Sequence, residues 1–406
     1  MIPFEQALKI VLDAAVAKID PSKETCERVS SENSCGRILK QIITSDRDMP
    51  PFCKSAVDGY ACKYVDLENG HVMSLLEVIS AGSAPKYQII EGHCSKVMTG
   101  AMVPEGTECV LMVEDAILEN DHVRTAPHYK VIRNKTNVCS QGEDLLAGTT
   151  ILTPGTILKP QHIAMLAAQG YTNIHVVPKL KVAVISTGDE LVKPSAVPSD
   201  VQIRDSNGWQ LLAQIDRAGA QPSYCGIIRD QHKNLQSTLS RALSKNTVIV
   251  LSGGVSMGDF DMVPDVLKSL GVKILFDRVA VQPGRPTTFG ILDYHGAPRF
   301  IFGLPGNPVS SFIQFELMVR PLLMALMGAS PQAITLRLPI SQTYRRKRAE
   351  RMAHVPMEVD ELGRCRLLNY NGSGHITALN SAHGLARIPL GVLELPENAA
   401  VEVILL

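Results

Sequence analysis

The chain has 406 residues, which is enough for about two to four domains of ordinary size. Hydrophobic residues make up 45% and charged residues 20%, a balance typical of soluble globular proteins. Forty basic residues match forty acidic ones, so general coating of nucleic acid, which needs a basic surplus, is excluded. No run reaches the roughly 18 apolar residues of a membrane span, and Glu5, Lys9 and Asp13 interrupt any signal-peptide core. We therefore expect a cytoplasmic protein.

Cysteine and histidine give no sign of a disulfide framework or a zinc knuckle. The nine cysteines are scattered without a CxxC pair, and the eleven histidines form no HxxxH pair. We expect reduced, mostly buried thiols, and no transition-metal site built from histidine and cysteine.

The N-terminal part alternates between helical and β-type patterns. Apolar residues recur at helical spacing over residues 4–19, and a second helical segment over 153–170 ends at a glycine. Between them, residues 46–146 contain short runs of period two separated by turns, typical of an all-β domain. We predict a helical linker domain formed by residues 1–45 and 147–177, interrupted by an all-β insert at 46–146.

Residues 178–328 alternate apolar strands with amphipathic helices. Strands are expected at "LKVAVIST" from Leu180, "PSYCGIIRD" from Pro222, "TVIVLSGG" from Thr247, "VKILFDRV" from Val272 and "RFIFGLPG" from Arg299. The helices between them include one after Asp205 and a long one over 307–327. This order predicts a three-layer αβα domain with a parallel-type sheet covered on both faces. Residues 329–406 again show period-two runs and predict a small β domain, barrel-like in form.

The loops after these strands are the expected ligand site, since open parallel sheets bind ligands beyond the carboxyl ends of their strands. They read Thr187-Gly188-Asp189-Glu190, Arg229-Asp230, Ser252-Gly253-Gly254-Val255-Ser256 and Gly303-Leu304-Pro305-Gly306-Asn307-Pro308. Glycines allow the backbone to approach a ligand closely, and acids can hold a hard cation. The helix after Asn307 offers free N–H groups to an anion. No GxxxxGK[ST] element occurs, so a phosphate-bearing ligand with Mg²⁺ is expected without a Walker P-loop.

Several motifs together resemble one protein family. "STGDEL" from Ser186, "GGVSMGDFDMV" from Gly253 and "GLPGNPVS" from Gly303 are similar to the molybdopterin-binding domain shared by MoeA, MogA and gephyrin. "PPFCKSAVDGYA" from Pro50, "VMTGAMVPEG" from Val97 and "QGEDLLAGT" from Gln141 resemble the MoeA branch. The resemblance covers essentially the whole chain, with its six motifs in the family's order.

This resemblance implies a homodimer that inserts molybdate into adenylylated molybdopterin with Mg²⁺ and releases AMP. It also implies an active site between the αβ domain of one subunit and the N-terminal domains of the other. Carried over by motif, the catalytic residues would be Asp58, Thr99, Asp144, Glu190, Asp230 and Asp261, of which Glu190, Asp230 and Asp261 would hold the metal. The substrate-binding residues would be Thr187, Gly188, Ser252, Gly253, Gly254, Ser256, Arg278, Pro305, Gly306, Asn307 and Pro308.

The implied molybdate site departs from the family pattern. It would comprise Gln282, Arg285, Ser310, Arg348 and Ser373. The family usually has lysine at the position of Gln282, and the element around Arg348 reads "RAERMA", with Arg351 in place of an aromatic residue and Ala353 in place of a second arginine. A dianion needs fixed positive donors, so these changes bear on oxyanion affinity rather than on the fold.

Two other functions remain open from the sequence. One is the MogA-type adenylylation of the pterin, which uses ATP. The other is a non-catalytic scaffold like the gephyrin E domain. Partners beyond the small substrates would be a MogA-type protein or the enzymes that accept the cofactor.

Overall fold

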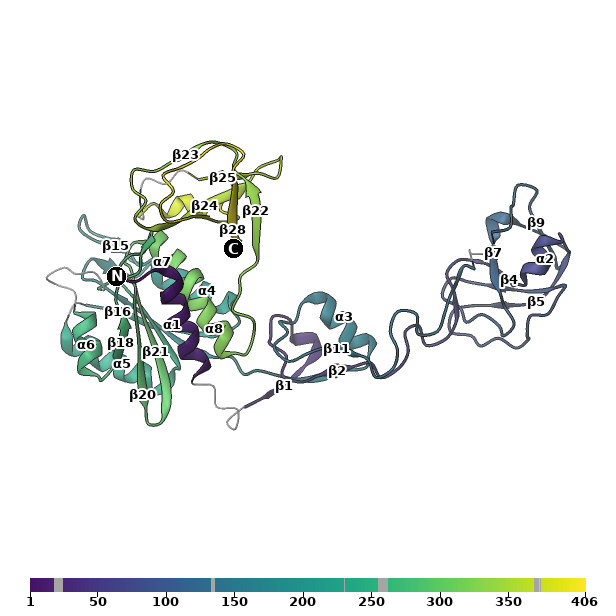
Figure 1. The fold of residues 1–406 in the computed structure, drawn as a ribbon. Helices are drawn as coiled ribbons and strands as arrows, with labels where there is room; N and C mark the ends of the chain where they lie inside the picture. Colours follow the sequence, from purple (N-terminus) through teal and green to yellow (C-terminus); the bar gives the residue numbers. More distant parts are fainter. Residues whose placement is uncertain (18–24, 133–135, 230, 255–261, 369–371, 373) are drawn as a thin grey trace. The chain divides into compact units, whose positions relative to one another are not determined.

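The computed structural model describes residues 1–17, 25–132, 136–229, 231–254, 262–368, 372 and 374–406 (Figure 1). The chain forms two compact units. The first contains Met1–Lys40, Pro154–Pro160 and Asn173–Leu406, and the second contains Gln41–Thr153 and Gln161–Thr172.

A six-stranded sheet organises the first unit. Its order is β16 (Gln221–Ile228), β13 (Lys181–Thr187), β17 (Val248–Ser252), β21 (Ala297–Leu304), β20 (Thr288–Tyr294) and β18 (Lys273–Phe276). The pairs β16–β13, β13–β17 and β17–β21 are parallel, as predicted. β20 is antiparallel to both neighbours, and the sequence analysis missed it.

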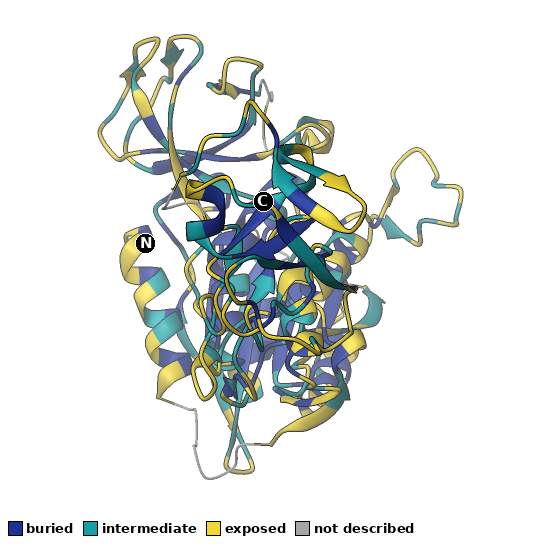
Figure 2. Ribbon diagram, turned by 90° about the vertical axis from the view of Figure 1, so that its right-hand side faces the viewer, coloured by how far each residue is buried: buried dark blue, intermediate teal, exposed yellow. Residues whose placement is uncertain are grey.

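The alternation of apolar residues along the central strands creates two hydrophobic layers. Val182 and Val184 of β13 face one layer, whereas Ala183 and Ile185 face the other. The central strands β13, β17 and β21 of this sheet are largely buried (Figure 2). The first layer contains α1 (Phe4–Val16), α4 (Asn207–Arg217), α7 (Pro308–Gln314), the π-helical turn η4 (Phe315–Val319) and α8 (Arg320–Leu326). The second layer contains α5 (His232–Lys245) and α6 (Val263–Ser269). The three-layer αβα prediction is confirmed by this packing.

Helix α1 does not pack where the sequence analysis placed it. The analysis assigned it to a helical linker domain with residues 147–177, but its buried Phe4, Ala7 and Val11 join the first layer of the αβ core. Its apolar stripe correctly predicts a buried helix, but the stripe alone does not identify the surface that covers it. Residues Pro308–Leu326 form one helical run that is long and apolar enough to cross a membrane, and most of this run is buried in the same core.

The C-terminal region forms a second six-stranded sheet in the order β19-β24-β26-β28-β22, with β25 added to β24. β19 comes from the αβ segment and pairs Gln282 with Ala353 of β24. The barrel-like closure remains a prediction. The elements are β19 (Val281–Gln282), β22 (Thr335–Pro339), β23 (Tyr344–Arg345), β24 (Met352–Val359), β25 (Cys365–Leu367), η5 (Ile376–Leu379), β26 (Gly384–Ile388), β27 (Glu394–Leu395) and β28 (Ala400–Leu405).

Short pairs complete the first unit. They are β1 (Glu27–Ser30) with β12 (Asn173–Val176), β14 (Leu191–Val192) with β15 (Ile203–Arg204), and β23 with β27. A 3₁₀ turn, η2 (Ser31–Asn33), follows β1.

The second unit contains the β insert and the strands that lead into it. Its six-stranded sheet has the order β7-β4-β6-β5-β9-β8, which agrees with the predicted β character. One short helix, α2, lies between the strands β4 and β5 of this sheet. The elements are β2 (Ile43–Thr44), β3 (Lys54–Ser55), β4 (Gly59–Cys62), α2 (Tyr64–Glu68), β5 (Met73–Ile79), β6 (His93–Val97), β7 (Cys109–Met112), η3 (Val113–Asp115), β8 (Ala116–Glu119), β9 (His122–Thr125), β10 (Val138–Cys139), β11 (Thr150–Leu152) and α3 (Pro160–Ala168), of which residues 161–168 belong to this unit.

Candidate active site

Three parallel strands of the αβ sheet end side by side and open into a pocket. Ser186 of β13 pairs with Ser252 of β17, which pairs with Leu304 of β21, so the loops that follow these strands begin at one edge. The pocket there measures about 730 Å³. Ten predicted site residues line it, namely Thr187, Gly188, Glu190, Ser252, Gly253, Gly254, Pro305, Gly306, Asn307 and Pro308. The loops that the strand-end rule selects therefore lie together around one pocket.

Two glycines keep the described start of the loop after β17 close to β13 and free of side chains. Gly253 has φ +91°, and a Cβ there would lie 2.4 Å from the carbonyl oxygen of Thr187. Gly254 has φ +63°, and a Cβ would lie 2.8 Å from Thr187 Oγ1. A larger residue at either position would strain the backbone and push the loop away from β13. The backbone of this loop is thus presented to the pocket.

The carboxylate of Glu190 lies over the turn that follows β13. Gly188 has φ +145°, and a Cβ there would lie 2.5 Å from Glu190 Oε2. The carbonyl oxygen of Glu190 accepts a hydrogen bond of 2.9 Å from the N–H of Ile203, which anchors this turn to β15. The exposed side chain of Glu190 is therefore a carboxylate that is held at the pocket and available to a ligand.

Asn207, the first residue of α4, ties the strand-end loops together. Its Nδ2 donates to Ser252 Oγ at 2.8 Å and to the carbonyl oxygen of Gly306 at 2.7 Å. A carbonyl can only accept, so these bonds fix the orientation of the amide. Asn207 Oδ1 is buried and has no hydrogen-bond partner among the described residues. This oxygen belongs to a residue that lines the pocket.

A buried carboxylate behind the pocket fixes the start of α4. Asp205 accepts hydrogen bonds from Ser186 Oγ at 2.6 Å, from the Tyr224 hydroxyl at 2.5 Å and from the N–H of Gly208 at 2.9 Å. Burial, reinforced by the bond to Asp205, raises the pKa of Tyr224, so this hydroxyl remains a donor. The helix that carries Asn207 is thereby held against β13 and β16.

The insert domain brings two of its three predicted catalytic residues together. Asp58 Oδ1 accepts hydrogen bonds from the hydroxyl of Thr99 at 2.7 Å and from its N–H at 2.6 Å. These bonds from Thr99 hold the pKa of Asp58 below its usual range. Gly59 is required next to Asp58 because a Cβ would lie 2.3 Å from the carbonyl oxygen of Leu111. Asp58 is therefore an exposed, ionised carboxylate at a fixed position.

The third predicted residue, Asp144, lies in a loop organised by Asp48. Asp48 accepts hydrogen bonds from the N–H of Ala147 at 2.9 Å and from Gln141 Nε2 at 2.8 Å, which lower its pKa. The N–H of Asp144 donates to the carbonyl oxygen of Met49 at 3.0 Å, and its side chain is exposed. Asp48 is a positioning residue that the sequence analysis missed.

The predicted oxyanion residues lie on several elements. Gln282 lines a separate pocket of about 390 Å³ with Tyr344, Arg345 and Gly372, among others. Arg345 pairs with Glu394 at 3.0 Å, while the predicted Arg348 is exposed and is not among the described residues that line this pocket. Among the described residues, the arginine that lines this pocket together with Gln282 is therefore Arg345.

Helix α7 fixes the loop that carries Gln282. Gln314 Nε2 donates to the carbonyl oxygen of Pro283 at 3.0 Å, and a Cβ at Gly284 would lie 2.4 Å from the same nitrogen. Arg285 is exposed, whereas Ser310 of α7 is buried. Gln314 is a second positioning residue absent from the sequence-based set.

Comparisons with known proteins cover nearly the entire chain. Residues 2–170 match the family model described as the MoeA N-terminal region (domain I and II), and residues 183–325 match that of a probable molybdopterin binding domain. The molybdopterin molybdenumtransferase of Staphylococcus epidermidis is 33% identical over 396 residues, covering 93% of this chain and 90% of that protein. The chain belongs to the MoeA family.

The MoeA-family fold also agrees with solved structures and with a further relative. The crystal structure of the molybdopterin biosynthesis moeA protein from Pyrococcus horikoshii OT3 has a TM-score of 0.82 at 27% identity, covering 100% of both chains. The molybdopterin molybdenumtransferase of Bacillus subtilis is 33% identical over 352 residues, covering 84% of this chain and 80% of that protein. The family resemblance recognised in the motifs is confirmed.

Not every residue carried over from the MoeA family can be placed. Asp230, Ser256, Asp261 and Ser373 lie outside the described residues. Arg278 is half-buried, and its carbonyl oxygen accepts the N–H of Ile2 at 3.1 Å. Asn207 was missed because its sequence context, "DSNGW", indicates a helix start, and its bonds to loops 45 and 99 residues away leave no local pattern.

Proposed function

We propose that this protein is a molybdopterin molybdenumtransferase that acts in molybdenum cofactor biosynthesis, inserting molybdate into adenylylated molybdopterin with Mg²⁺ and releasing AMP. The observation that carries the proposal is the pocket at the ends of β13, β17 and β21. Most of its lining residues lie within the segment that matches the molybdopterin binding domain, in a chain that its relatives match over most of its length.

The pocket suits a ligand with a pterin and phosphate groups. Its volume of about 730 Å³ is within the range of roughly 300–1,000 Å³ for small-molecule sites. Pro305, Gly306 and Asn307 lead into the helical run that begins at Pro308, whose first N–H groups and positive dipole end favour a phosphate. The side-chain-free loop at Gly253 and Gly254 allows a bulky ligand to approach the backbone.

The described residues of the pocket fit Mg²⁺. This ion takes oxygen ligands in small numbers and keeps several waters, and Glu190 offers a carboxylate. Asn207 Oδ1 is a second, buried oxygen without a hydrogen-bond partner among the described residues. When bound, Mg²⁺ supplies neutralisation of the phosphate charge during cleavage of the phosphoanhydride. Asn207 and the loop glycines would hold the ligand, while Glu190 orients the phosphate end.

Molybdate is assigned to a set of basic and polar side chains from the αβ segment and the C-terminal region. Arg285, Arg348 and Ser310 would provide charge-assisted and neutral hydrogen bonds, and Gln282 a neutral one. We add Arg345 to this set, because it lines the same pocket as Gln282.

Asp58, Thr99 and Asp144 are assigned to the same reaction, acting in the active site of a second copy of the chain in a homodimer. The support is that Asp58 and Thr99 lie in the compact unit that does not include the αβ pocket. Asp58 is also exposed, although its two bonds to Thr99 hold it in one position. The resemblance to the family's composite site completes the argument.

Reconstitution tests this function. The purified protein is supplied with adenylylated molybdopterin, Mg²⁺ and molybdate, and the release of AMP and the formation of active cofactor are followed. We expect AMP release that depends on Mg²⁺ and cofactor formation that depends on molybdate. Adenylylation of free molybdopterin by ATP, without AMP release from the adenylylated form, would instead identify the MogA-type reaction. Absence of both activities would leave the scaffold function.

A further inference from the structure

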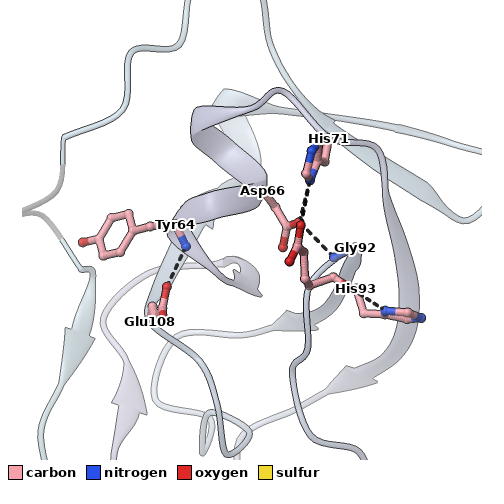
Figure 3. Close-up of polar contacts among 7 residues, drawn as sticks. Tyr64, Asp66, His71, Gly92, His93 and Glu108 are labelled. Atoms are coloured by element: carbon pink, nitrogen blue, oxygen red, sulfur yellow. Dashed lines mark hydrogen bonds and ion pairs between the residues drawn. The ribbon is translucent and has the colours of Figure 1, made fainter.

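The β insert gathers the imidazole of His71 and the carboxylates of Asp66 and Glu91 at a place that has no part in the proposed reaction. Figure 3 shows His71 and Asp66 of this cluster. Asp66 lies in α2, His71 follows that helix, and Glu91 precedes β6. One ligand atom from each lies within 4.8 Å of the others. His71 Nδ1 is 3.1 Å from Asp66 Oδ1 and 3.8 Å from Glu91 Oε1.

The two separations from His71 Nδ1 are close to the spacing of ligand atoms around a small divalent metal ion. Metal bonds of about 2.0–2.1 Å in a tetrahedral arrangement place ligand atoms about 3.3–3.4 Å apart. The two measured distances, 3.1 and 3.8 Å, lie on either side of that value. Small rotations of exposed side chains are enough to close the difference, since the side chain of Glu91 is 62% exposed.

Asp66 gives an independent reason to expect a ligand. Its side chain is fully buried, and its Oδ1 accepts hydrogen bonds from the N–H of Gly92 at 2.9 Å and from His71. Its Oδ2 is buried without a hydrogen-bond partner among the described residues. A buried carboxylate oxygen without a partner carries an uncompensated desolvation cost. A cation that is bound by His71 and Glu91 and also contacts Oδ2 of Asp66 would remove that cost.

The backbone around the cluster is already held in place. The N–H of His71 donates to the carbonyl oxygen of Asp66 at 2.9 Å, and the N–H of Ser74 donates to that of Gly92 at 2.8 Å. These bonds and the bond from Gly92 to Asp66 join the end of α2 to the segment before β6. The site is therefore preorganised, which lowers the entropy that binding must overcome.

We propose that Asp66, His71 and Glu91 bind a divalent transition metal ion of the Zn²⁺ type, with water in the fourth position. Imidazole together with carboxylates favours Zn²⁺ over Mg²⁺, which prefers oxygen ligands alone. The bound ion links α2 to the entrance of β6 and rigidifies this end of the insert domain. The site is independent of the reaction proposed for the αβ pocket.

Metal titration of the full-length protein tests this site. After removal of metal with a chelator, Zn²⁺ binding is measured by calorimetry and Co²⁺ binding by its visible absorption, in excess Mg²⁺ to occupy sites built from oxygen alone. We expect His71→Ala and Glu91→Gln each to weaken Zn²⁺ binding at one site at least tenfold and to abolish the corresponding Co²⁺ absorption. His122→Ala removes an exposed imidazole of the same domain and should leave both signals unchanged.

A second measurement separates metal binding from simple ion pairing. If His71 serves only as a protonated partner of Asp66, the wild-type protein will show no saturable Co²⁺ absorption, and the proposal fails. Equal Zn²⁺ affinity and stoichiometry in the wild type and in His71→Ala would also overturn it. Amide hydrogen exchange over residues 68–73 and 88–93 should slow on addition of Zn²⁺ in the wild type and not in either variant. The partial exposure of His71 and Glu91 makes both variants compatible with folding.

Discussion

The αβ pocket and the loops of the β insert that carry Asp58 and Asp144 present their polar groups in different ways. In the αβ domain, buried hydrogen bonds from Asn207 and Asp205 connect the loops of neighbouring strands. In the insert, Asp58 and Asp144 are exposed carboxylates, and of these two it is Asp58 that has a close side-chain partner, Thr99. The pocket of the αβ domain is therefore shaped by buried hydrogen bonds, whereas the acids of the insert lie on its surface.

This difference separates residues that shape a site from residues that act in it. Removing a buried polar group from the αβ domain should disturb folding and chemistry together, because it leaves partners unpaired. Removing an exposed acid from the insert should affect chemistry alone, because exposed substitutions usually change stability by less than about 0.5 kcal/mol. Variants of single residues can therefore test the comparison.

The largest effect is expected at Glu190, the exposed acid of the αβ pocket. Glu190→Gln keeps the size of the side chain and removes its charge. If Glu190 stabilises charge in the transition state, the rate of AMP release should fall on the order of 10²–10³-fold. Unfolding by urea should be unchanged, since the side chain is exposed. A near-normal rate at saturating Mg²⁺ would remove Glu190 from the reaction.

The equivalent test in the insert is Asp58→Asn. The amide oxygen can still accept from Thr99, so the fold should persist, but the negative charge is lost. We expect a fall in AMP release on the order of 10²-fold. Glu119→Gln, which neutralises an exposed acid on β8, is the matched control and should leave the rate unchanged. Equal rates in the two variants would assign Asp58 a purely structural position.

A buried histidine sharpens the comparison within the first unit. His354 of β24 is buried against Phe4, with ring centroids 5.3 Å apart, and neither of its nitrogens has a hydrogen-bond partner among the described residues. Burial lowers the pKa of His354 from 6.5 to about 3. The unfolded chain therefore binds a proton between these values and the folded chain does not. The contribution of neutral His354 to the free energy of unfolding is fully present above pH 6.5 and is lost as the pH falls toward 3.

His354→Leu should remove this pH dependence. Urea unfolding is compared at pH 7 and pH 5. Between these values the free energy of unfolding of the wild type should fall by about 2 kcal/mol more than that of the variant, because about 1.4 kcal/mol is lost per pH unit below the pKa of the unfolded chain. At pH 7 the variant should be at least as stable, since an unpartnered polar group is replaced by an apolar one. His122→Leu on the surface of the insert is the control. Parallel pH profiles for wild type and His354→Leu would contradict the assignment of a neutral, buried imidazole.

The smallest effect is expected at Gln282, a neutral side chain in the proposed oxyanion site. Gln282 is exposed in the pocket that Arg345 also lines. Restoring a cation with Gln282→Lys should tighten molybdate binding roughly tenfold, because a charge-assisted bond contributes about 1.4 kcal/mol more than a neutral one. Molybdate titrations at equal ionic strength measure this change. Unchanged affinity would exclude Gln282 from the oxyanion site.

The elements that the sequence predicted are those with a strong local pattern. The parallel strands have continuous apolar runs, and the loops at their ends follow from the strand-end rule. β20 was missed because its hairpin with β21 turns at His295 and Gly296, both with positive φ, instead of the Asn-Gly or Asp-Gly pair that marks such turns. The position of α1 was missed because an apolar stripe does not identify its partner surface.

The residues around the pocket could be predicted where they lie in loops next to a strand, and could not be predicted where they join the pocket through long-range contacts. Glu190, Gly253 and Asn307 lie within three residues of a strand end, so they could be chosen from the sequence. Asn207 and Gln314 act through hydrogen bonds to residues distant in the chain. The Asp66–His71–Glu91 cluster likewise has no motif spacing, because Glu91 joins it only through the fold of the insert.

The most direct test of the account is whether the two regions can complement each other when each is damaged in a different copy of the chain. An Asp58→Ala protein and a Glu190→Ala protein, each inactive alone, are mixed under conditions that exchange subunits, and AMP release is measured. We expect activity to return in the mixture, because a heterodimer contains one site with both acids intact. If both variants fold and dimerise but no mixture recovers activity, a site shared between two copies is contradicted.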